Sequence, residues 1–367
     1  MAYQLIPELL ELNRAQSELY LQQAPARKAY RAKHPTLIAA FKCMDGRVHL
    51  PVMTRTPFGL IRAFRNIGGI FELGWPALRA RMSELRGYAL ARGRHFLCMA
   101  TYHYSQGDAH RGCAGHKYDT EKAKLAAADV VKGLNFFNEV DPLRQTYAIM
   151  VGVETDCEAL VFHGKDGRTV SMADYAAADG DKLRTLIREL YPDMPAQMVL
   201  DLLPLMAGNA LHVSEICKQP KVGMELQHME RILAVGMGFD WLHKINYALI
   251  INDTDPLLDQ SIATAASIIK GNRDAGRIPK ESAVFFASVS YYDENERNGA
   301  IMNARYLTRL GMDAIRKAHP DLEGFFKPLT AVMHWDTRQL EVVEGPSSQT
   351  AEATAAPAER SAQPAHA

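Results

Sequence analysis

Residues 37–47, with the sequence LIAAFKCMDGR, join an apolar run to a group of polar and sulfur-bearing side chains. The first five residues predict a buried strand, because a short apolar run bounded by polar residues is typical of a sheet interior. Cys43, Asp45 and Arg47 follow directly after this run. We therefore expect these three side chains at the carboxyl end of a strand, where parallel α/β sheets place their functional residues.

Segments of helical and strand character alternate along the first half of the chain. Helices are expected over residues 1–34, 75–93 and 117–138. Strands are expected over residues 37–41, 95–102, 147–153 and 159–162. Strands that are separated by helices pair in parallel, so this order predicts an α/β fold in which a mostly parallel sheet is flanked by helices.

Two further motifs follow in the chain, RNIGG at residues 65–69 and HRGCAG at residues 110–115. Two cysteine thiolates and one imidazole are a suitable donor set for Zn²⁺, which accepts sulfur and nitrogen in a tetrahedral site. Three protein ligands leave a fourth position for water, which distinguishes a catalytic zinc from a structural one. The motifs therefore predict a catalytic zinc held by Cys43, Cys113 and a nearby histidine.

The blocks CMDGR, RNIGG and HRGCAG resemble, in the same order, the signature blocks of the β-carbonic anhydrase superfamily. The resemblance extends over about residues 35–163. It implies zinc-dependent reversible hydration of CO₂ to bicarbonate. It also implies zinc ligands at Cys43, His110 and Cys113, and a catalytic pair formed by Asp45 and Arg47.

The histidine ligand has two candidates. His110 is preferred, because its HxxC spacing to Cys113 suits a turn that opens a helix. His103 is the rival, because the histidine of the family normally ends its strand, and here the strand is expected to end at residues 102–103. Both alternatives stay open at this point.

The resemblance also implies how the site works. Zinc lowers the pKa of a bound water toward neutrality, and the resulting zinc-bound hydroxide attacks CO₂. Asp45, held by Arg47, accepts a hydrogen bond from this hydroxide and orients it. If Asp45 were released, its carboxylate could become a fourth ligand and close the site.

The second half of the chain repeats the plan of the first. Residues 231–240 align with residues 36–45, and residues 283–292 align with the strand that begins at His95. Several such anchors keep nearly one offset, which indicates an internal duplication. This tandem architecture resembles the carboxysomal shell branch of the superfamily.

The metal-binding residues change in the second copy. In this register Cys43 aligns with Gly238, His103 with Ser290, His110 with Arg297 and Cys113 with Ala300, whereas Asp45 aligns with Asp240. We therefore expect a zinc-binding catalytic domain over residues 1–165 and a degenerate metal-free repeat with a helical lead-in over residues 166–344. A disordered tail is expected over residues 345–367, whose composition offers little apolar surface to bury.

The bulk composition limits the function classes. Lys and Arg number 42, as do Asp and Glu, so the formal net charge gives no support for nucleic acid or an anionic membrane as partner. Neither a secretory signal nor a membrane span is expected. The five cysteines are expected to be reduced, which indicates the cytoplasm. The resemblance to the carboxysomal shell branch implies that the chain could lie within a carboxysome-like compartment there.

Other functions stay open alongside CO₂ hydration. The same chemistry could hydrolyse carbonyl sulfide or carbon disulfide. The chain could also be a zinc-binding subunit of an inorganic-carbon transport or shell assembly. CO₂ or bicarbonate is the expected ligand, and a homo-oligomer or a carbon-concentrating assembly is the expected protein partner.

Overall fold

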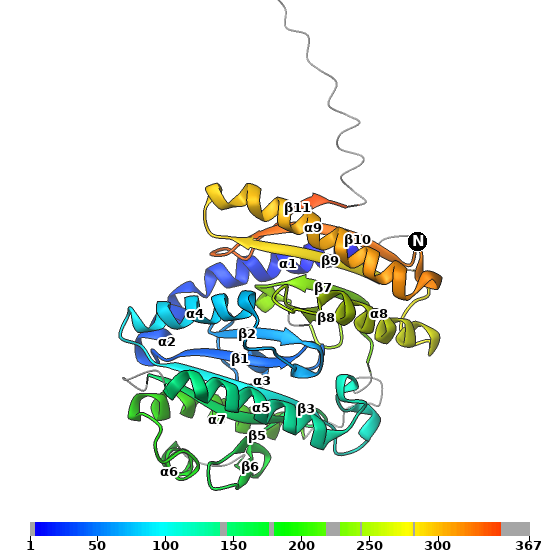
Figure 1. Ribbon diagram of the computed structural model, residues 1–367. Coiled ribbons are helices and arrows are strands. Elements are labelled where there is room, and N and C mark those ends of the chain that lie inside the picture. Colours follow the sequence, from blue (N-terminus) through cyan, green and yellow to red (C-terminus); the bar gives the residue numbers. More distant parts are fainter. Residues whose placement is uncertain are drawn as a thin grey trace, which may run out of the picture.

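Two sheets with matching strand order form the framework of the chain (Figure 1). The structure is a computed structural model that describes residues 4–139, 145–175, 180–217, 228–242, 244–281 and 283–345. The predicted tail, residues 345–367, lies outside the described residues except for Gly345.

The first sheet has the strand order β2-β1-β3-β4-β5-β6. Its strands are β1 (Leu37–Cys43), β2 (Ile61–Asn66), β3 (Phe96–Tyr104), β4 (Thr146–Glu154), β5 (Ala159–His163) and β6 (Thr169–Ser171). The strands from β2 to β4 pair in parallel, and β5 and β6 extend one edge in antiparallel fashion. The apolar run that begins at Leu37 therefore lies in an interior strand, which carries Cys43 at its carboxyl end.

The second sheet has the same plan, with the order β8-β7-β9-β10-β11. Its strands are β7 (Ile232–Gly236), β8 (Ala248–Ile251), β9 (Ala283–Tyr291), β10 (Phe326–His334) and β11 (Leu340–Glu344). Again the first four pair in parallel and the last pairs antiparallel. The predicted α/β class, with two mostly parallel sheets flanked by helices, is confirmed.

Helices cover both faces of each sheet. They are α1 (Leu5–Gln22), α2 (Ala24–Lys33), α3 (Leu50–Met53), α4 (Pro76–Leu90), α5 (Thr120–Glu139), α6 (Gly180–Leu190), α7 (Ala196–Ile216), α8 (Leu258–Asp274) and α9 (Glu294–Ala318). Helices α4 and α5 cover one face of the first sheet, where Phe41 packs with Leu78 and Leu134. Helices α8 and α9 cover one face of the second. In the part of the chain that the structure describes, none of the helices is both long and apolar enough to cross a membrane.

The helix expected over residues 1–34 is divided in two. Helix α1 ends at Gln22 and α2 begins at Ala24, with Pro25 in its first turn. Proline has no backbone N–H to continue the hydrogen bonds of α1, but it is well tolerated at the start of a new helix.

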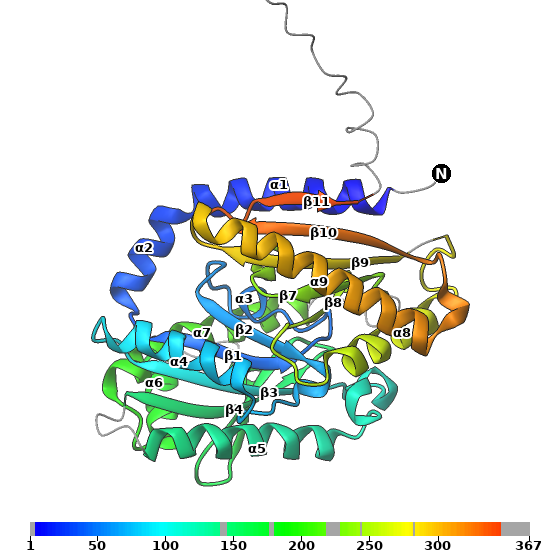
Figure 2. The ribbon, with the colours of Figure 1, turned by 45° about the horizontal axis from the view of Figure 1, so that its top comes forward.

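The two halves exchange helices. Helix α1, at the start of the chain, packs on the second sheet, where Leu5 and Leu9 share a buried cluster with Phe286 (Figure 2). Helix α7, which precedes the second sheet in sequence, packs on the first, where Leu202 joins the cluster of Phe162. The domain boundary predicted at residues 165 and 166 stays a prediction, but apolar packing crosses it in both directions.

The two sheets also meet directly, along a seam beside β2 and β8. The Ile250 N–H donates to the Met44 carbonyl at 3.1 Å, and the Asn252 N–H donates to the Arg65 carbonyl at 2.9 Å. Met44 lies between Cys43 and Asp45 in sequence, so the second half holds the backbone of the predicted site.

Candidate metal centre

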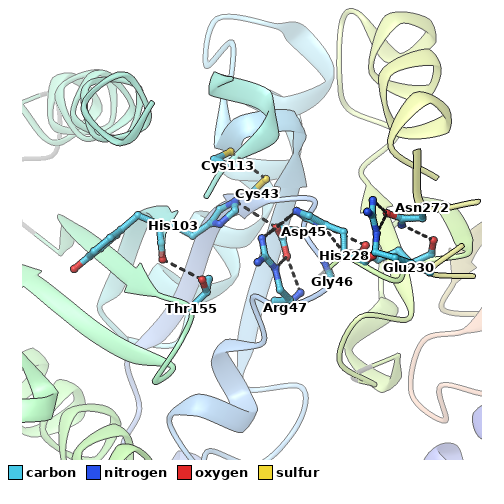
Figure 3. Close-up of polar contacts among 12 residues, drawn as sticks. Cys43, Asp45, Gly46, Arg47, His103, Cys113, Thr155, His228, Glu230 and Asn272 are labelled. Carbon is cyan, nitrogen blue, oxygen red and sulfur yellow. Dashed lines mark hydrogen bonds and ion pairs between the residues drawn. The ribbon is translucent and has the colours of Figure 1, made fainter. Parts of the chain in front are cut away.

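The carboxyl ends of two paired strands bring the central residues of the site together. Cys43 is the last residue of β1, and His103 is the penultimate residue of β3. These strands pair in parallel, so their carboxyl ends lie at one edge of the sheet. Cys113 approaches this edge from the loop after β3, directly before the short helix Ala114–His116 (Figure 3).

Cys43, His103 and Cys113 form a compact cluster of donor atoms. The two Sγ atoms are 3.7 Å apart, and the potential ligand atoms of all three residues lie within 4.8 Å of one another. All three side chains are buried. Among the residues that the structure describes, neither ring nitrogen of His103 has a hydrogen-bond partner. A buried polar group without a partner is costly. A zinc ion would satisfy one ring nitrogen, so these residues fit the metal that the motifs imply.

The two thiols differ in acidity. The contact with Cys113, together with His103, holds the pKa of Cys43 well below its ordinary value despite burial. The same contact, together with burial, raises the pKa of Cys113 well above its ordinary value. One proton therefore remains with Cys113 while Cys43 is disposed to be a thiolate, the form that binds metal.

His110, the histidine preferred from the sequence, is not part of this cluster. Its side chain is 85% exposed, with Nδ1 at 3.4 Å from the Asp108 carboxylate. Asp108 caps the short helix Ala109–Arg111 by accepting a hydrogen bond from the His110 N–H, and this turn lies outside the cluster. The structure therefore places His103, and not His110, beside the two cysteines.

Asp45 and Arg47 form a buried ion pair beside the cluster. The Arg47 backbone N–H and Nε donate to Asp45 Oδ1 at 2.8 and 3.0 Å, and Nη2 donates to Oδ2 at 2.7 Å. Burial by itself would raise the pKa of Asp45, but Arg47 and His103 lower it well below its ordinary value. Asp45 Oδ2 lies 3.6 Å from His103 Nε2, so the carboxylate is adjacent to the cluster while Arg47 holds it.

Two residues that the sequence analysis missed complete the surroundings of this pair. His228 and Glu230 lie directly before β7, and together with Asp45 they form a second group of potential ligand atoms within 4.8 Å of one another. His228 Nε2 is 3.1 Å from Arg47 Nη2. The only sequence signal was a histidine and a glutamate two residues apart, immediately before the first strand of the repeat.

The corresponding edge of the second sheet has different chemistry. Gly238 has a φ of 84°, and a Cβ at this position would lie 2.4 Å from the methyl group of Met333. The Asp240 carboxylate accepts a hydrogen bond at 2.8 Å from Nε of Arg338, a residue that follows β10. These strand ends line a cavity of about 100 Å³ together with residues of the first half.

The sequence profile for the catalytic domain of carboxysome shell carbonic anhydrase matches residues 36–225, which is more than half of the chain. The chain belongs to this family. The matched segment contains Cys43, His103 and Cys113 as well as Asp45 and Arg47. It ends before His228.

Individual relatives have the same description. The chain is 25% identical to the carboxysome shell carbonic anhydrase of Prochlorococcus marinus strain MIT 9313, over 68% of this chain and 54% of the relative. It is 23% identical to that of Hydrogenovibrio crunogenus, over 54% of this chain and 44% of the relative. The chain thus spans about half the length of the curated relatives it matches.

Proposed function

We propose that this chain binds one zinc ion through Cys43, His103 and Cys113 and catalyses the reversible hydration of CO₂ to bicarbonate. The observation that carries the proposal is the buried Cys–His–Cys cluster beside the Asp45–Arg47 ion pair. Membership of the carboxysome shell carbonic anhydrase family supports it. The donor set is one that Zn²⁺ prefers, and with three protein ligands it leaves room for a reactant.

A zinc ion in such a site lowers the pKa of water toward neutrality and so supplies a hydroxide nucleophile. The residues of the chain direct this nucleophile. Asp45 is kept ionised by Arg47, so it can only accept a hydrogen bond. Asp45 would therefore accept the proton end of a nucleophile that the metal supplies and leave its lone pair for the carbon of CO₂.

Arg47 positions Asp45. By engaging both carboxylate oxygens it fixes the orientation of Asp45, and it would keep this carboxylate from binding a metal held by Cys43, His103 and Cys113. The pair is buried, so water competes weakly for these hydrogen bonds and the geometry is preorganised.

Metal analysis and stopped-flow CO₂ hydration on one purified sample test this proposal. We expect about one zinc per chain, and hydration that is lost on chelation and restored by zinc. A sample that contains zinc but does not hydrate CO₂ would contradict the proposal. Turnover of carbonyl sulfide or carbon disulfide by that sample would favour the related hydrolase.

We also propose that the chain acts within a carbon-concentrating assembly, because its relatives are named for the carboxysome shell. The test is co-sedimentation of the purified chain with isolated carboxysome shells. A chain that stays in the supernatant, while hydrating CO₂ normally, contradicts the association and leaves the enzymatic proposal intact.

A further inference from the structure

We propose that His228 and Glu230 form a positioning pair that holds Arg47 against Asp45. The inference rests on the proposed function, because it assigns a purpose to residues around the proposed metal site. Both residues lie beyond the segment that the family profile matches. They belong to the second half of the chain, which would thereby supply part of the machinery of the first.

A continuous chain of polar contacts leads from Glu230 to Asp45 (Figure 3). Both Glu230 carboxylate oxygens lie close to His228 Nδ1, at 3.2 and 3.3 Å. His228 Nε2 lies 3.1 Å from Arg47 Nη2, and Nη2 donates to Asp45 at 2.7 Å. Glu230 Oε1 also accepts a hydrogen bond at 3.2 Å from the N–H of Gly46. The pair therefore contacts both the side chain and the backbone of the CMDGR loop.

The chemistry of the partners selects one tautomer of His228. An arginine side chain has only donors, so a hydrogen bond from Arg47 requires a lone pair on His228 Nε2. The proton then resides on Nδ1, where the Glu230 carboxylate accepts it. Burial opposes ionisation of His228, but Glu230 and Asp45 raise its pKa above the ordinary value, so the neutral form that accepts from Arg47 is the one present at alkaline pH. Glu230 is thus a carboxylate that fixes the accepting nitrogen of His228 toward Arg47.

The second half also holds this pair rigidly. The Asn272 side chain in α8 donates to the Glu230 carbonyl at 3.0 Å, and Arg277 Nε donates to the His228 carbonyl at 2.9 Å. The backbone of both residues is therefore anchored before the side chains reach across the seam. Supporting groups of this kind maintain functional geometry by restricting the rotamers of the groups that they contact.

Loss of His228 and Glu230 should loosen the Asp45–Arg47 ion pair and leave the metal bound. Without an acceptor at Nε2, Arg47 Nη2 loses its contact with His228, and the guanidinium becomes freer to turn away from Asp45. Asp45 Oδ2 is already 3.6 Å from His103 Nε2, so a released carboxylate would lie within reach of a metal held by the cluster. His228 would thus favour the state in which the fourth position is open.

The test compares His228→Ala, His228→Gln and Glu230→Gln, each loaded with zinc or cobalt. We expect His228→Ala to keep its metal and lose kcat by about tenfold or more at alkaline pH, where the histidine of the parent is neutral. Zinc X-ray absorption and the cobalt visible spectrum should report an added carboxylate oxygen. His228→Gln, which provides an amide oxygen to Arg47, should regain most of the activity and the parent spectrum. Glu230→Gln should fall between the two.

His212→Ala is the matched control, because His212 also contacts a buried glutamate, with Nε2 at 2.7 Å from Glu158 Oε2. It lies in α7, outside the metal centre, and its removal should leave kcat and the metal spectra unchanged. A His228→Ala variant with the kcat and spectra of the parent overturns the proposal. Equal losses in the alanine and glutamine variants, with unchanged spectra, overturn it as well. If the parent protein itself fails to hydrate CO₂, the proposed function fails, and the metal spectra alone still decide whether the pair positions Asp45.

Discussion

The two sheets have matching strand order, but the side chains at the carboxyl ends of their strands differ in kind. In the first half, β1 and β3 lead to Cys43 and His103, whereas β7 and β9 lead to Gly238 and Ser290. The second edge also has little room, because Gly238 has a positive φ and a side chain there would meet Met333. We therefore expect the metal chemistry at the edge of the first sheet alone.

In the alignment of the two halves, Asp45 is the site residue that has an identical counterpart, Asp240. The surroundings of the two aspartates differ. Asp45 pairs with Arg47, two residues away, beside the metal centre. Asp240 pairs with Arg338, a fully buried residue 98 positions away, whose guanidinium lies over Trp335. The Arg338 carbonyl in turn accepts a hydrogen bond from Asn13 of α1. The first aspartate thus faces the proposed reaction, and the second fastens α1 to its sheet.

The largest effect should come from removing one half. Deleting residues 231–344 removes the sheet on which α1 packs and exposes buried side chains such as Leu5 and Leu9. Each buried leucine contributes roughly 2 kcal/mol, so we expect insoluble protein. Deletion of residues 346–367 is the control and should change neither metal content nor rate. A soluble, active first half would show that the halves are independent.

Cys43→Ser and Cys113→Ser should each abolish zinc binding and CO₂ hydration together, because a hydroxyl is a poor ligand where a thiolate is required. Cys98→Ser is the control, since Cys98 is buried in β3 and is not in the cluster. Elemental analysis of the parent tests the comparison itself. Nearly two zinc ions per chain would mean that the second half still binds metal.

His103→Ala should lose most of its zinc, whereas His110→Ala should keep it. The reason is that His103 lies between the cysteines and Asp45, and the His110 side chain is 85% exposed. Zinc content after dialysis against a weak chelator gives the answer. Retention of zinc by His103→Ala and its loss from His110→Ala would restore the HxxC assignment.

Asp45→Asn and Asp240→Asn test the two aspartates directly. Asp45→Asn should keep zinc and lose roughly a hundredfold in kcat, because an amide cannot replace the accepting carboxylate. Asp240→Asn should keep kcat and lose about 3 kcal/mol of stability, since it leaves Arg338 buried without a counter-charge. Stopped-flow rates and thermal melts distinguish these outcomes. Similar losses of kcat in both variants would contradict the proposed division of roles.

Arg47→Ala should have an effect that depends on pH. Arg47 lowers the pKa of Asp45 and holds the carboxylate, so its removal raises that pKa and frees the carboxylate to turn toward the metal. We expect activity to be lost near neutral pH and partly regained at alkaline pH, where hydroxide competes with the carboxylate. A pH–rate profile with zinc X-ray absorption measures both. Full activity near neutral pH would refute the proposal that Arg47 keeps Asp45 from binding the metal.

The sequence was sufficient to predict the two sheets and the two cysteines. Alternating strands and helices predict parallel sheets, and Cys43 follows a run whose burial is evident from its composition. The histidine was harder to assign. His103 already lay at the expected end of the strand, and the choice between it and His110 depends on how the loop after β3 places Cys113 beside that strand end.

His228 and Glu230 could not be predicted from local patterns. Their place beside Arg47 depends on the seam between the sheets, where the Ile250 N–H meets the Met44 carbonyl. Helix amphipathicity likewise indicates that α1 has an apolar face but not which sheet covers it. Both features are long-range contacts, which only the assembled fold reveals.

The exchanged helices have a consequence for how the protein is made. Helix α1 leaves the ribosome well before the strand β10 on which it packs. At the usual rate of synthesis, α1 waits on the order of tens of seconds for its docking surface. We expect the nascent chain to expose an apolar stripe throughout that time. The packing of α1 can form only after β10 has been synthesised, so a ribosome that stalls before this strand leaves α1 without its docking surface.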